Sequence, residues 1–480
     1  MKLKDNKIYR FIVIPICIAL CFFGRFIPPI GGLSSDAIGV ICIFVASLIL
    51  RLTIGIDRPS LLCIFSLGFL ENVKFSNVLS TSFGNSTFIF LLFTFICTYA
   101  LSKTSLIKRI AISFVDLKIA KKNGFIFIIL FLLAVLLLGL FISPSVLFVV
   151  ILPILNEIFE IAGIEKGEKV AKVLLMGLGF TVSISSGMTT IAHVFPILAL
   201  NAAKIEISPI QYMVIAMPVG LILFILLLLI FKIFINPDTS KLINVNVKII
   251  KDRLPKIDKK DIITLLIFVI VIILRIIPSI FKDISPDFYN AINQYGTAMP
   301  PILGTIALCI LRVDNQPLIS IEEAFKKGVP WSSLIMCAAT LALGSVLTSD
   351  SIGIKAFLES KISGGVSGMS FILIIIIFAL WAALQTNLSS NMVTATLVAT
   401  VASTIIPTVT TQINLTSLVC VIGMLASFAF ATPPSMPHIA IVAGSDYCST
   451  KDVLLYGGIM MGFSVLIALT VGYPIGLLLF

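Results

Sequence analysis

Charged side chains are scarce in this chain. Asp, Glu, Lys and Arg make up only 12% of its 480 residues, whereas a soluble domain keeps about 25% of its residues charged. Half of that share leaves too few charges to hold a surface of this size in water. Most of the surface must therefore face lipid, which excludes a soluble globular protein.

Histidine is rarer still, with two residues in the whole chain. An integral membrane enzyme, such as a lipid-linked transferase, needs catalytic carboxylates or a metal site at a membrane face. The sequence contains no His-Glu-x-x-His motif. Such an enzyme is only a remote alternative, and we predict no catalytic residues.

Cysteine and basic residues are present, but not in the patterns of metal or nucleic-acid sites. The nine cysteines, such as Cys17 and Cys420, lie mostly inside apolar runs without metal-ligand spacing, so we interpret them as core residues. The net charge of +11 comes from Lys and Arg in short loops beside apolar runs. No basic cluster is interleaved with aromatic residues, so we expect no nucleic-acid partner.

Long apolar runs account for most of the sequence. Residues of hydrophobic type make up 59% of the chain, and the mean hydropathy is +1.15. With about 20 apolar residues needed for each crossing, we predict an all-α polytopic protein of the cell membrane, with about eleven transmembrane helices plus two re-entrant hairpins. Basic loops then place the N-terminus inside and Phe480 outside. The predicted organisation is an N-terminal span over residues 1–34, a first repeat over 35–235, a cytoplasmic linker over 236–261 and a second repeat over 262–480.

The two halves of the sequence repeat. The stretch FGNSTFIFLLFTFICTYALSKTSLIKRIA at 83–111 resembles VPWSSLIMCAATLALGSVLTSDSIGIKAF at 329–357. The histidines His193 and His438 stand at nearly the same offset (438 − 193 = 245). An odd number of crossings between the copies makes this an inverted repeat with broken helices. That architecture is typical of alternating-access transporters, which hold their substrate at the midplane between interrupted helices.

Four polar breaks interrupt the apolar runs. They are ISPS at 142–145, VSISSGMTT at 182–190, QTNLSSNM at 385–392 and FATPPSMP at 430–437. Unpaired backbone groups at membrane depth cost several kcal/mol each, so a break persists only when it is buried in protein or lines a wet cavity. One break alone could equally be a kink whose hydroxyl bonds back to its own helix. Four breaks paired by a repeat favour a binding site.

The chemistry of these breaks suits an anion. Ser143 is a reasonable N-cap with Pro144 at the first helical position, and Ser390 and Asn391 play the same role in the second half. A helix that starts at mid-membrane aims free N–H groups and a partial positive charge at its ligand. Hydroxyl and carbonyl oxygens at the same breaks could ligate sodium. No Lys or Arg lies near a break in the sequence, so we expect neutral dipoles and co-bound cations to hold the anion.

Four intramembrane side chains leave alternatives open. Arg25 and Arg275 stand near the outer ends of their spans, where snorkelling to the interface is favoured over a gating role. His193 and His438 each follow a break by a few residues. They are either hydrogen-bonded packing residues or groups that couple transport to protons.

These stretches resemble the divalent anion:sodium symporter family of di- and tricarboxylate transporters, from about residue 35 onward. QTNLSSNMVTATL resembles the family's second hairpin, whose motif is Ser-Asn-Thr, and FATPP resembles its second unwound helix. Two positions depart from the family pattern. Pro144 replaces the first Asn, and Met392 replaces the second Thr.

The resemblance implies a sodium-coupled secondary transporter of a small organic anion, working as an elevator and as a homodimer, with sodium as coupling ion and no other cofactor. The alternative is a proton-coupled or exchange permease for another anion in the same superfamily. Carried over residue by residue, the implied substrate-binding residues are Ser143, Ser145, Thr189, Ser390, Asn391, Thr432 and Pro433. The implied sodium ligands are Ser143, Ser145, Gly187, Thr386, Ser389, Asn391 and Ala431.

Overall fold

A computed structural model describes residues 9–191, 193–243, 245–281, 284–347, 349–354, 357, 370–388, 390–433 and 435–480. Almost all of the regular structure in this part of the chain is helical, as predicted. The exception is a hairpin of two short antiparallel strands, β1 (Arg312–Val313) and β2 (Gln316–Pro317).

The helices of the first half begin with short N-terminal segments and end with a long helix that continues as a π-helix. They are η2 (Tyr9–Val13), α1 (Ile14–Phe23), η3 (Gly24–Phe26), α2 (Ser35–Ile54), α3 (Asp57–Leu67), α4 (Phe75–Thr81), α5 (Ser86–Ser102), α6 (Leu106–Val115), α7 (Gly124–Gly139), α8 (Pro144–Ala162), α9 (Lys169–Gly187), α10 (Val194–Ala202), α11 (Pro209–Ile230) and η4 (Phe231–Ile235).

Two short helices then lead into the second half. The remaining helices are α12 (Ser240–Ile243), α13 (Val247–Arg253), α14 (Lys259–Phe281), α15 (Pro286–Asn293), α16 (Met299–Ile310), α17 (Ile321–Glu323), η5 (Ala324–Gly328), α18 (Trp331–Leu347), α20 (Phe371–Leu388), α21 (Asn391–Val409), α22 (Leu415–Ser427), α23 (Pro437–Ala443), α24 (Thr450–Ile467), η6 (Ala468–Gly472) and α25 (Tyr473–Leu479).

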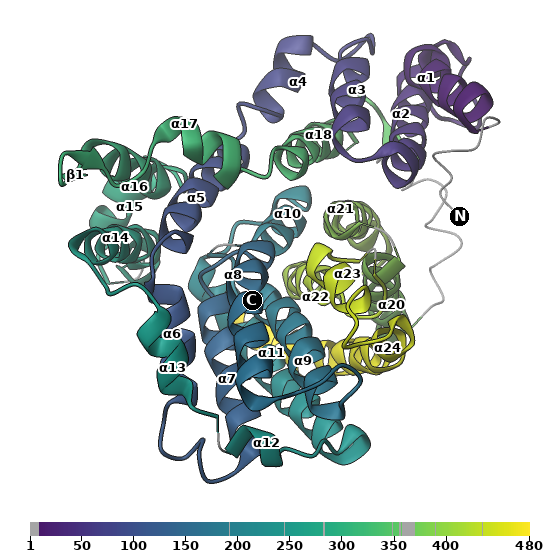
Figure 1. Ribbon diagram of the computed structural model, residues 1–480. Helices are drawn as coiled ribbons and strands as arrows, with labels where there is room; N and C mark the ends of the chain where they lie inside the picture. The colour runs from purple at the N-terminus through teal and green to yellow at the C-terminus, as the bar shows by residue number, and fades with distance from the viewer. Residues whose placement is uncertain are drawn as a thin grey trace.

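An outer arc of helices surrounds a central bundle (Figure 1). The arc contains α1, α2, α3, α18, α5, α16 and α14, and neighbours such as α3 and α18 or α5 and α16 pack against each other. The central bundle contains α7 to α11 and α20 to α24. Within it α10 packs on α21 and α22, so the two halves of the sequence meet at the centre of the molecule.

The first residues of corresponding helices show the repeat. α7 begins at residue 124 and α20 at residue 371 (371 − 124 = 247), while α8 begins at 144 and α21 at 391 (391 − 144 = 247). In each half the next helix, α9 in the first and α22 in the second, ends in a non-helical segment. Two of the predicted breaks are shifted, because α9 stays helical through Gly187 and α22 ends at Ser427. The described non-helical residues are therefore 188–191 and 193, which we call the first unwound segment, and 428–433 and 435–436, the second unwound segment.

Seven helical segments among the described residues are long and apolar enough to cross a membrane, and a bent pair, Ile321–Gly328 with Trp331–Leu347, makes up to eight. Other apolar helices are shorter, such as Gly124–Gly139 and Leu415–Ser427. Both of these adjoin a polar break, which explains why they fall short of a full crossing. The count of about eleven crossings stays a prediction.

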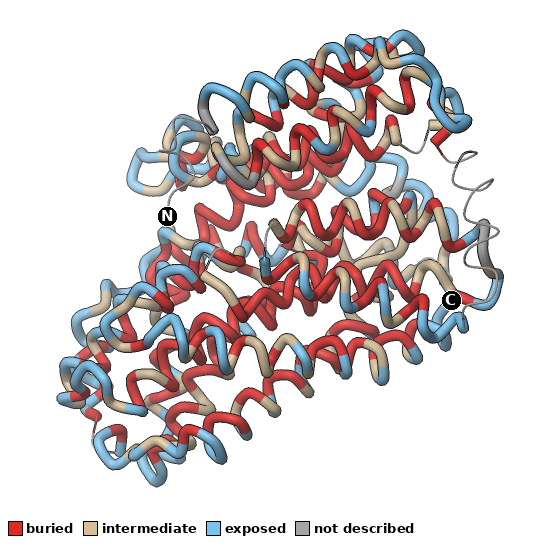
Figure 2. The backbone as a smooth tube through the Cα atoms, turned by 90° about the vertical axis from the view of Figure 1, so that its right-hand side faces the viewer, coloured by how far each residue is buried: buried red, intermediate tan, exposed pale blue. Residues whose placement is uncertain are grey.

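The distribution of buried and exposed residues agrees with the lipid-facing surface expected from the composition. The residues inside the bundle are buried while the outward faces are exposed (Figure 2). Large apolar side chains such as Leu229, Phe234 and Leu478 lie on the exposed faces. An exposed apolar surface of this extent is typical of contact with a membrane.

The predicted cytoplasmic linker is not a free tether. Its helices α12 and α13 bury Leu242 and Ile250 against the bundle. Arg109 from the basic loop 103–122 donates hydrogen bonds from Nε to the Pro255 carbonyl at 2.8 Å and from Nη2 to the Leu254 carbonyl at 2.9 Å. The two basic segments thus lie side by side, as expected if both face the cytoplasm.

A third basic segment, around 312–327, joins the same end of the molecule. Lys103 forms an ion pair of 3.1 Å with Glu323, which also accepts a hydrogen bond from Tyr99 Oη at 3.0 Å. Lys103 and Tyr99 of the first half thus both hold the Glu323 carboxylate of the second half.

A cysteine at Lys256 should react with an impermeant thiol reagent only after the cells are permeabilised. Lys256 is exposed in the linker, so reagent access depends on the side of the membrane. The matched position is Tyr295, which is 64% exposed. It follows the stretch FKDISPDFYNAINQ at 281–294, which carries acidic residues and is predicted to lie outside, so a cysteine there should react in intact cells. Labelling of the Lys256→Cys variant in intact cells would contradict the predicted topology.

Candidate functional site

The four non-helical segments converge because of how the bundle helices pack. α10 lies against α21 and α22, and α9 lies against α22 and α23. This arrangement brings the turn 140–143 and the first unwound segment toward Ser390 and the second unwound segment. His193 contacts the Gly139 carbonyl, and Gly187 packs on Phe428. We take this meeting point as the candidate site.

Asn387, the last buried residue of α20 before the hairpin tip, holds the second unwound segment in place. Its Oδ1 accepts hydrogen bonds from the backbone N–H groups of Phe430 and Ala431, both at 2.8 Å. Its Nδ2 donates to the Ala383 carbonyl at 2.9 Å and to the Phe428 carbonyl at 3.3 Å. One amide thus provides hydrogen-bond partners for backbone groups of the second unwound segment, which has no helix to satisfy them. No sequence pattern singled out Asn387 for this role, although it stands within the QTNLSSNM break.

Hydroxyl groups complete this network. Thr386 is fully buried and donates to the Ala426 carbonyl at 2.7 Å. Thr432 donates to the Asn387 carbonyl, and Ser435 donates to the Thr432 carbonyl at 2.6 Å. Three of the predicted residues, Thr386, Ala431 and Thr432, therefore surround Asn387, while Pro433 follows them half-buried in the same segment.

The tip of the second hairpin matches the predicted helix start. Ser390 has an extended backbone and caps α21, with its Oγ accepting from the Val393 N–H at 3.5 Å. Asn391 is only 5% exposed, and its Nδ2 has no hydrogen-bond partner. A buried amide donor left without a partner costs about 1–3 kcal/mol, which a bound oxygen would recover. Ser389, the remaining predicted cation ligand, lies outside the described residues.

The first hairpin is more open than the second. Ser143 begins α8 with an extended backbone and Pro144 is the first helical residue, both as predicted. The Ser143 side chain, however, makes no capping hydrogen bond, and Ser145 is exposed. The two serines therefore do not form a closed set of ligands here.

Gly187 joins the two unwound segments by close packing. A Cβ on Gly187 would lie 2.3 Å from Cε1 of Phe428, so only glycine permits this approach. Its carbonyl already accepts a hydrogen bond from Tyr212 Oη at 2.9 Å, a contact that no sequence pattern indicated. Nearby, the buried Thr189 accepts from the Ile191 N–H at 2.9 Å through Oγ1. Both predicted residues thus have structural contacts in addition to their implied roles.

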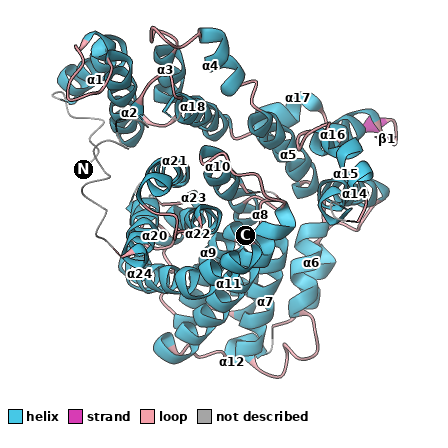
Figure 3. Cartoon of the chain, turned by 180° about the vertical axis from the view of Figure 1, so that it is seen from behind, coloured by secondary structure: helices cyan, strands magenta, loops and turns pink. Residues whose placement is uncertain are grey.

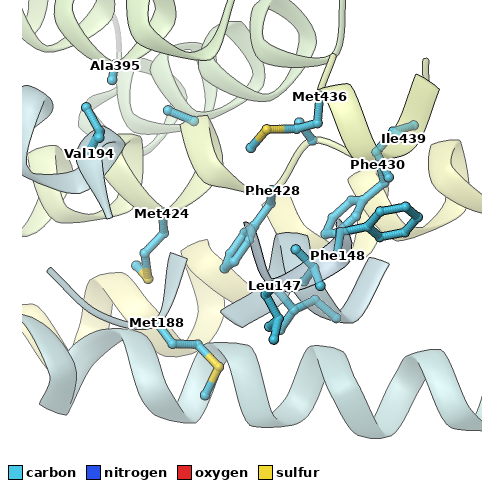
Figure 4. Close-up of a cluster of buried hydrophobic side chains, with 14 of the residues drawn as sticks. Leu147, Phe148, Met188, Val194, Ala395, Met424, Phe428, Phe430, Met436 and Ile439 are labelled. Atoms are coloured by element: carbon cyan, nitrogen blue, oxygen red, sulfur yellow. The ribbon is translucent and has the colours of Figure 1, made fainter. Parts of the chain in front are cut away.

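An apolar cluster lies beside these polar groups (Figure 4). Phe428 and Phe430 stack with ring centroids 6.1 Å apart, and Leu147, Phe148 and Met188 belong to the same cluster. All are buried. In such a dry surrounding, every unpaired polar group is costly, which is why the Asn387 network is needed.

The two histidines link elements of the site. His193 Nε2 lies 2.7 Å from the Gly139 carbonyl, and His438 Nε2 lies 2.9 Å from Ser183 Oγ. Both rings are buried, and neither forms an ion pair with an acidic side chain of the described residues. Each ring thus makes a packing contact through Nε2, while its buried Nδ1 has no hydrogen-bond partner, so proton coupling stays the alternative prediction.

The prediction that Arg275 snorkels to the interface is wrong. Its Nη1 donates to the Ile191 carbonyl at 2.5 Å, and its guanidinium lies 4.2 Å from the centroid of the Phe90 ring. The side chain therefore turns into the protein and reaches an unwound segment. The expectation that no basic residue approaches a break held only along the sequence, since α14 lies beside this segment in space. Arg25 lies instead over the exposed Phe26 ring, at 4.6 Å from its centroid.

Acidic residues offer no alternative site in the part of the chain that the structure describes. No cluster of three His, Cys, Asp or Glu side chains that could hold a metal is found there. The sequence has an Asp-x-x-Asp pair at 258 and 261, but Asp258 Oδ1 accepts from the Asp261 N–H at 2.7 Å at the start of α14, and Asp261 accepts from Ser105 Oγ at 2.6 Å. These carboxylates cap a helix and fix a neighbouring one.

Comparison with known proteins agrees with this geometry. The family model described as the sodium:sulfate symporter transmembrane region matches residues 6–480. A relative from Staphylococcus saprophyticus, the sodium-dependent dicarboxylate transporter SdcS, is 23% identical over 416 residues, which is 82% of this chain and 77% of the relative. The family match covers all four breaks.

Proposed function

The chain belongs to the family of the sodium:sulfate symporter transmembrane region, and from this premise we propose that it carries a small di- or tricarboxylate anion across the membrane together with sodium. Family and relative are transporters, not enzymes. The coarser statement, that this multi-pass membrane protein is a sodium-coupled anion transporter, follows from the family. The substrate class rests on the site and on the dicarboxylate relative.

The observation that carries the proposal is the unpartnered, buried Nδ2 of Asn391 at the start of α21. A carboxylate oxygen would accept from this amide and from the free N–H groups of the first helical turn. The partial positive charge of the helix start adds to the attraction. Ser390, which caps the same helix, adds a hydroxyl group beside it. The site therefore suits an anion held by neutral donors.

Sodium takes oxygen ligands, and the second half offers buried ones. Thr386, Asn391 and the Ala431 carbonyl are all buried there. In the first half Ser145 is exposed and the Gly187 carbonyl is already hydrogen-bonded to Tyr212. Pro144 offers neither a side-chain oxygen nor an N–H. The second cation site is thus the stronger one in our proposal, and the first is weak or absent.

The arc and the bundle suggest how the site moves (Figure 3). All four breaks belong to the central bundle, and the arc wraps one side of it. We propose that the bundle carries the site across the membrane against a fixed arc, as an elevator. The homodimer implied by the family resemblance is part of the same proposal.

Initial uptake of labelled succinate into vesicles should require sodium and rise with its concentration with a Hill coefficient near one. The reason is that only one cation site keeps its side-chain oxygens. The measurement is initial rate against sodium concentration at fixed pH, with potassium as the replacement ion. A Hill coefficient clearly above one would show that the first site survives.

The same assay separates the rival functions. Uptake without sodium that depends on anion inside the vesicle would indicate exchange. Uptake driven by a pH gradient alone would indicate a proton-coupled permease. No uptake of succinate, sulfate or citrate under any gradient would remove the proposed function.

A further inference from the structure

Arg51, near the end of α2, is a buried arginine without a partner. The residue is 7% exposed, and its Nε and Nη2 atoms make no hydrogen bond. No ion pair to Arg51 is found among the described residues. Nothing in the sequence signalled this, because Arg51 stands far from all four breaks.

The guanidinium lines a small cavity between α2, α18 and α21. The other lining side chains include Phe44 of α2, Thr340 of α18, and Thr396 and Thr400 of α21. Thr400 Oγ1 is also buried without a hydrogen-bond partner. Two unsatisfied polar groups on opposite walls thus belong to one cavity.

A positive charge in such a place needs compensation. Removing a cation from water costs several kcal/mol when no opposite charge and no full set of hydrogen bonds replaces the water. Arg275 shows the contrast, because its guanidinium has both a carbonyl acceptor and an aromatic face. Arg51 has neither among the described residues, so none of them compensates its charge.

The cavity and the candidate site share one face of α21. Val393, Leu397 and Thr400 line it from α21, and at spacings of three and four residues they share a helix face with Ser390. Ser390 Oγ in turn lies 3.9 Å from the Met336 sulfur of α18. Met336 and Thr340 are one helical turn apart on α18. Ser390 and Met336 therefore lie on the same faces of α21 and α18 as the residues that line the cavity beside Arg51.

We propose that this cavity is a second anion site, in which Arg51 and Thr400 hold a carboxylate of a soluble anion at the interface between the arc and the bundle. This proposal rests on the proposed function, since the anion is of the transported class. A planar guanidinium donates two parallel hydrogen bonds to a carboxylate, and the two free donors of Arg51 fit that use. A lipid phosphate has the same chemistry and is the rival source.

The test is succinate uptake and succinate-induced stabilisation in four variants. Arg51→Gln should raise the KM for succinate at least about tenfold, as expected for losing a charge-assisted hydrogen bond, with the sodium dependence unchanged. Arg51→Lys should lose less. Thr400→Val keeps the shape of the cavity and should raise KM by a smaller factor. Arg25→Gln, which removes an arginine at the surface, is the control and should match the parent.

A stabilisation measurement and a second variant make the result interpretable in every case. Purified protein in a nonionic detergent should gain thermal stability with succinate or sulfate, and Arg51→Gln should reduce that gain. This arm works even if the parent transports neither anion, so failure of the proposed function is distinguishable. If Arg51→Gln does not fold, Thr400→Val decides.

Three results would overturn the proposal. One is a KM within twofold in both Arg51→Gln and Thr400→Val. Another is an anion-induced stabilisation equal to that of the parent in both variants. The third is a dependence of the parent on phosphatidylglycerol, compared with phosphatidylcholine vesicles, that Arg51→Gln abolishes without a change in KM. That result would assign the cavity to a lipid.

Discussion

Replacing Asn391 with alanine should leave a folded membrane protein that no longer transports. The amide is buried at the first position of α21 with a free donor. In the proposed function this amide serves both the anion and the sodium ion. A hydrogen bond to a charged group contributes about 1.5–3 kcal/mol, so losing both contacts should lower uptake by more than about a hundredfold. The measurement is initial uptake of labelled succinate under a sodium gradient.

Stability supplies the second measurement for this variant. Because Nδ2 of Asn391 has no partner in the protein itself, its removal should change the melting temperature without ligand very little. The rise of melting temperature with succinate and sodium should shrink, since that rise reports binding to the native state. Asn414→Ala is the matched control, because Asn414 caps α22 with Oδ1 accepting from the Ser417 N–H at 2.9 Å. It should lose the stability of a helix cap, about 1 kcal/mol, and keep transport. Normal uptake in Asn391→Ala would remove this residue from the site.

The sequence was sufficient to predict where the two hairpin helices α8 and α21 begin. Ser143, Pro144 and Ser390 carry strong local signals for a helix start, and the structure begins α8 and α21 where those signals stand. The pairing of the breaks was also predictable, because the repeat offset is visible along the chain. Helix-capping preferences depend on a few neighbouring residues, so they can be recognised in the sequence without knowing the fold.

Contacts between distant elements could not be predicted in this way. Whether Ile191 meets Arg275, or Gly187 meets Phe428, depends on which helices pack side by side. The end of α9 shows the same limit. Ser183 and Gly187 look like a break in the sequence, but buried contacts with the second unwound segment keep the helix intact to Gly187. Tertiary packing overrides local preference at these positions.

Asn387 shows both what the sequence could indicate and what it could not. An amide inside an apolar run indicates that some polar partner must be near. Its partners are the backbone groups of 428–431, which lie about forty residues further along the chain. The sequence therefore indicated a polar break there, while only the fold identifies the residue that satisfies it.

Asn387→Leu should disrupt the second unwound segment and with it both ligand sites. Leucine nearly preserves the volume but removes every polar atom of a side chain that makes four hydrogen bonds. Each buried backbone group left unpaired costs about 1–3 kcal/mol, so we expect a loss of about 4 kcal/mol or more, reduced wherever water enters. The melting temperature without ligand should fall by several degrees, and succinate uptake should be lost. This fall separates the variant from Asn391→Ala, which should lose transport at nearly unchanged stability.

The control for Asn387→Leu is Asn201→Ala at the end of α10. Asn201 also donates two hydrogen bonds from Nδ2, to Thr87 Oγ1 at 2.8 Å and to the Ile197 carbonyl at 2.9 Å. It is exposed, so water can replace both partners, and stability and uptake should stay close to those of the parent. The buried position of Asn387 prevents that replacement, because its four partners lie inside the dry cluster around Phe428. Uptake at the parental rate, with a melting temperature within about 2 °C of the parent, would show that the unwound segment keeps its shape without this amide.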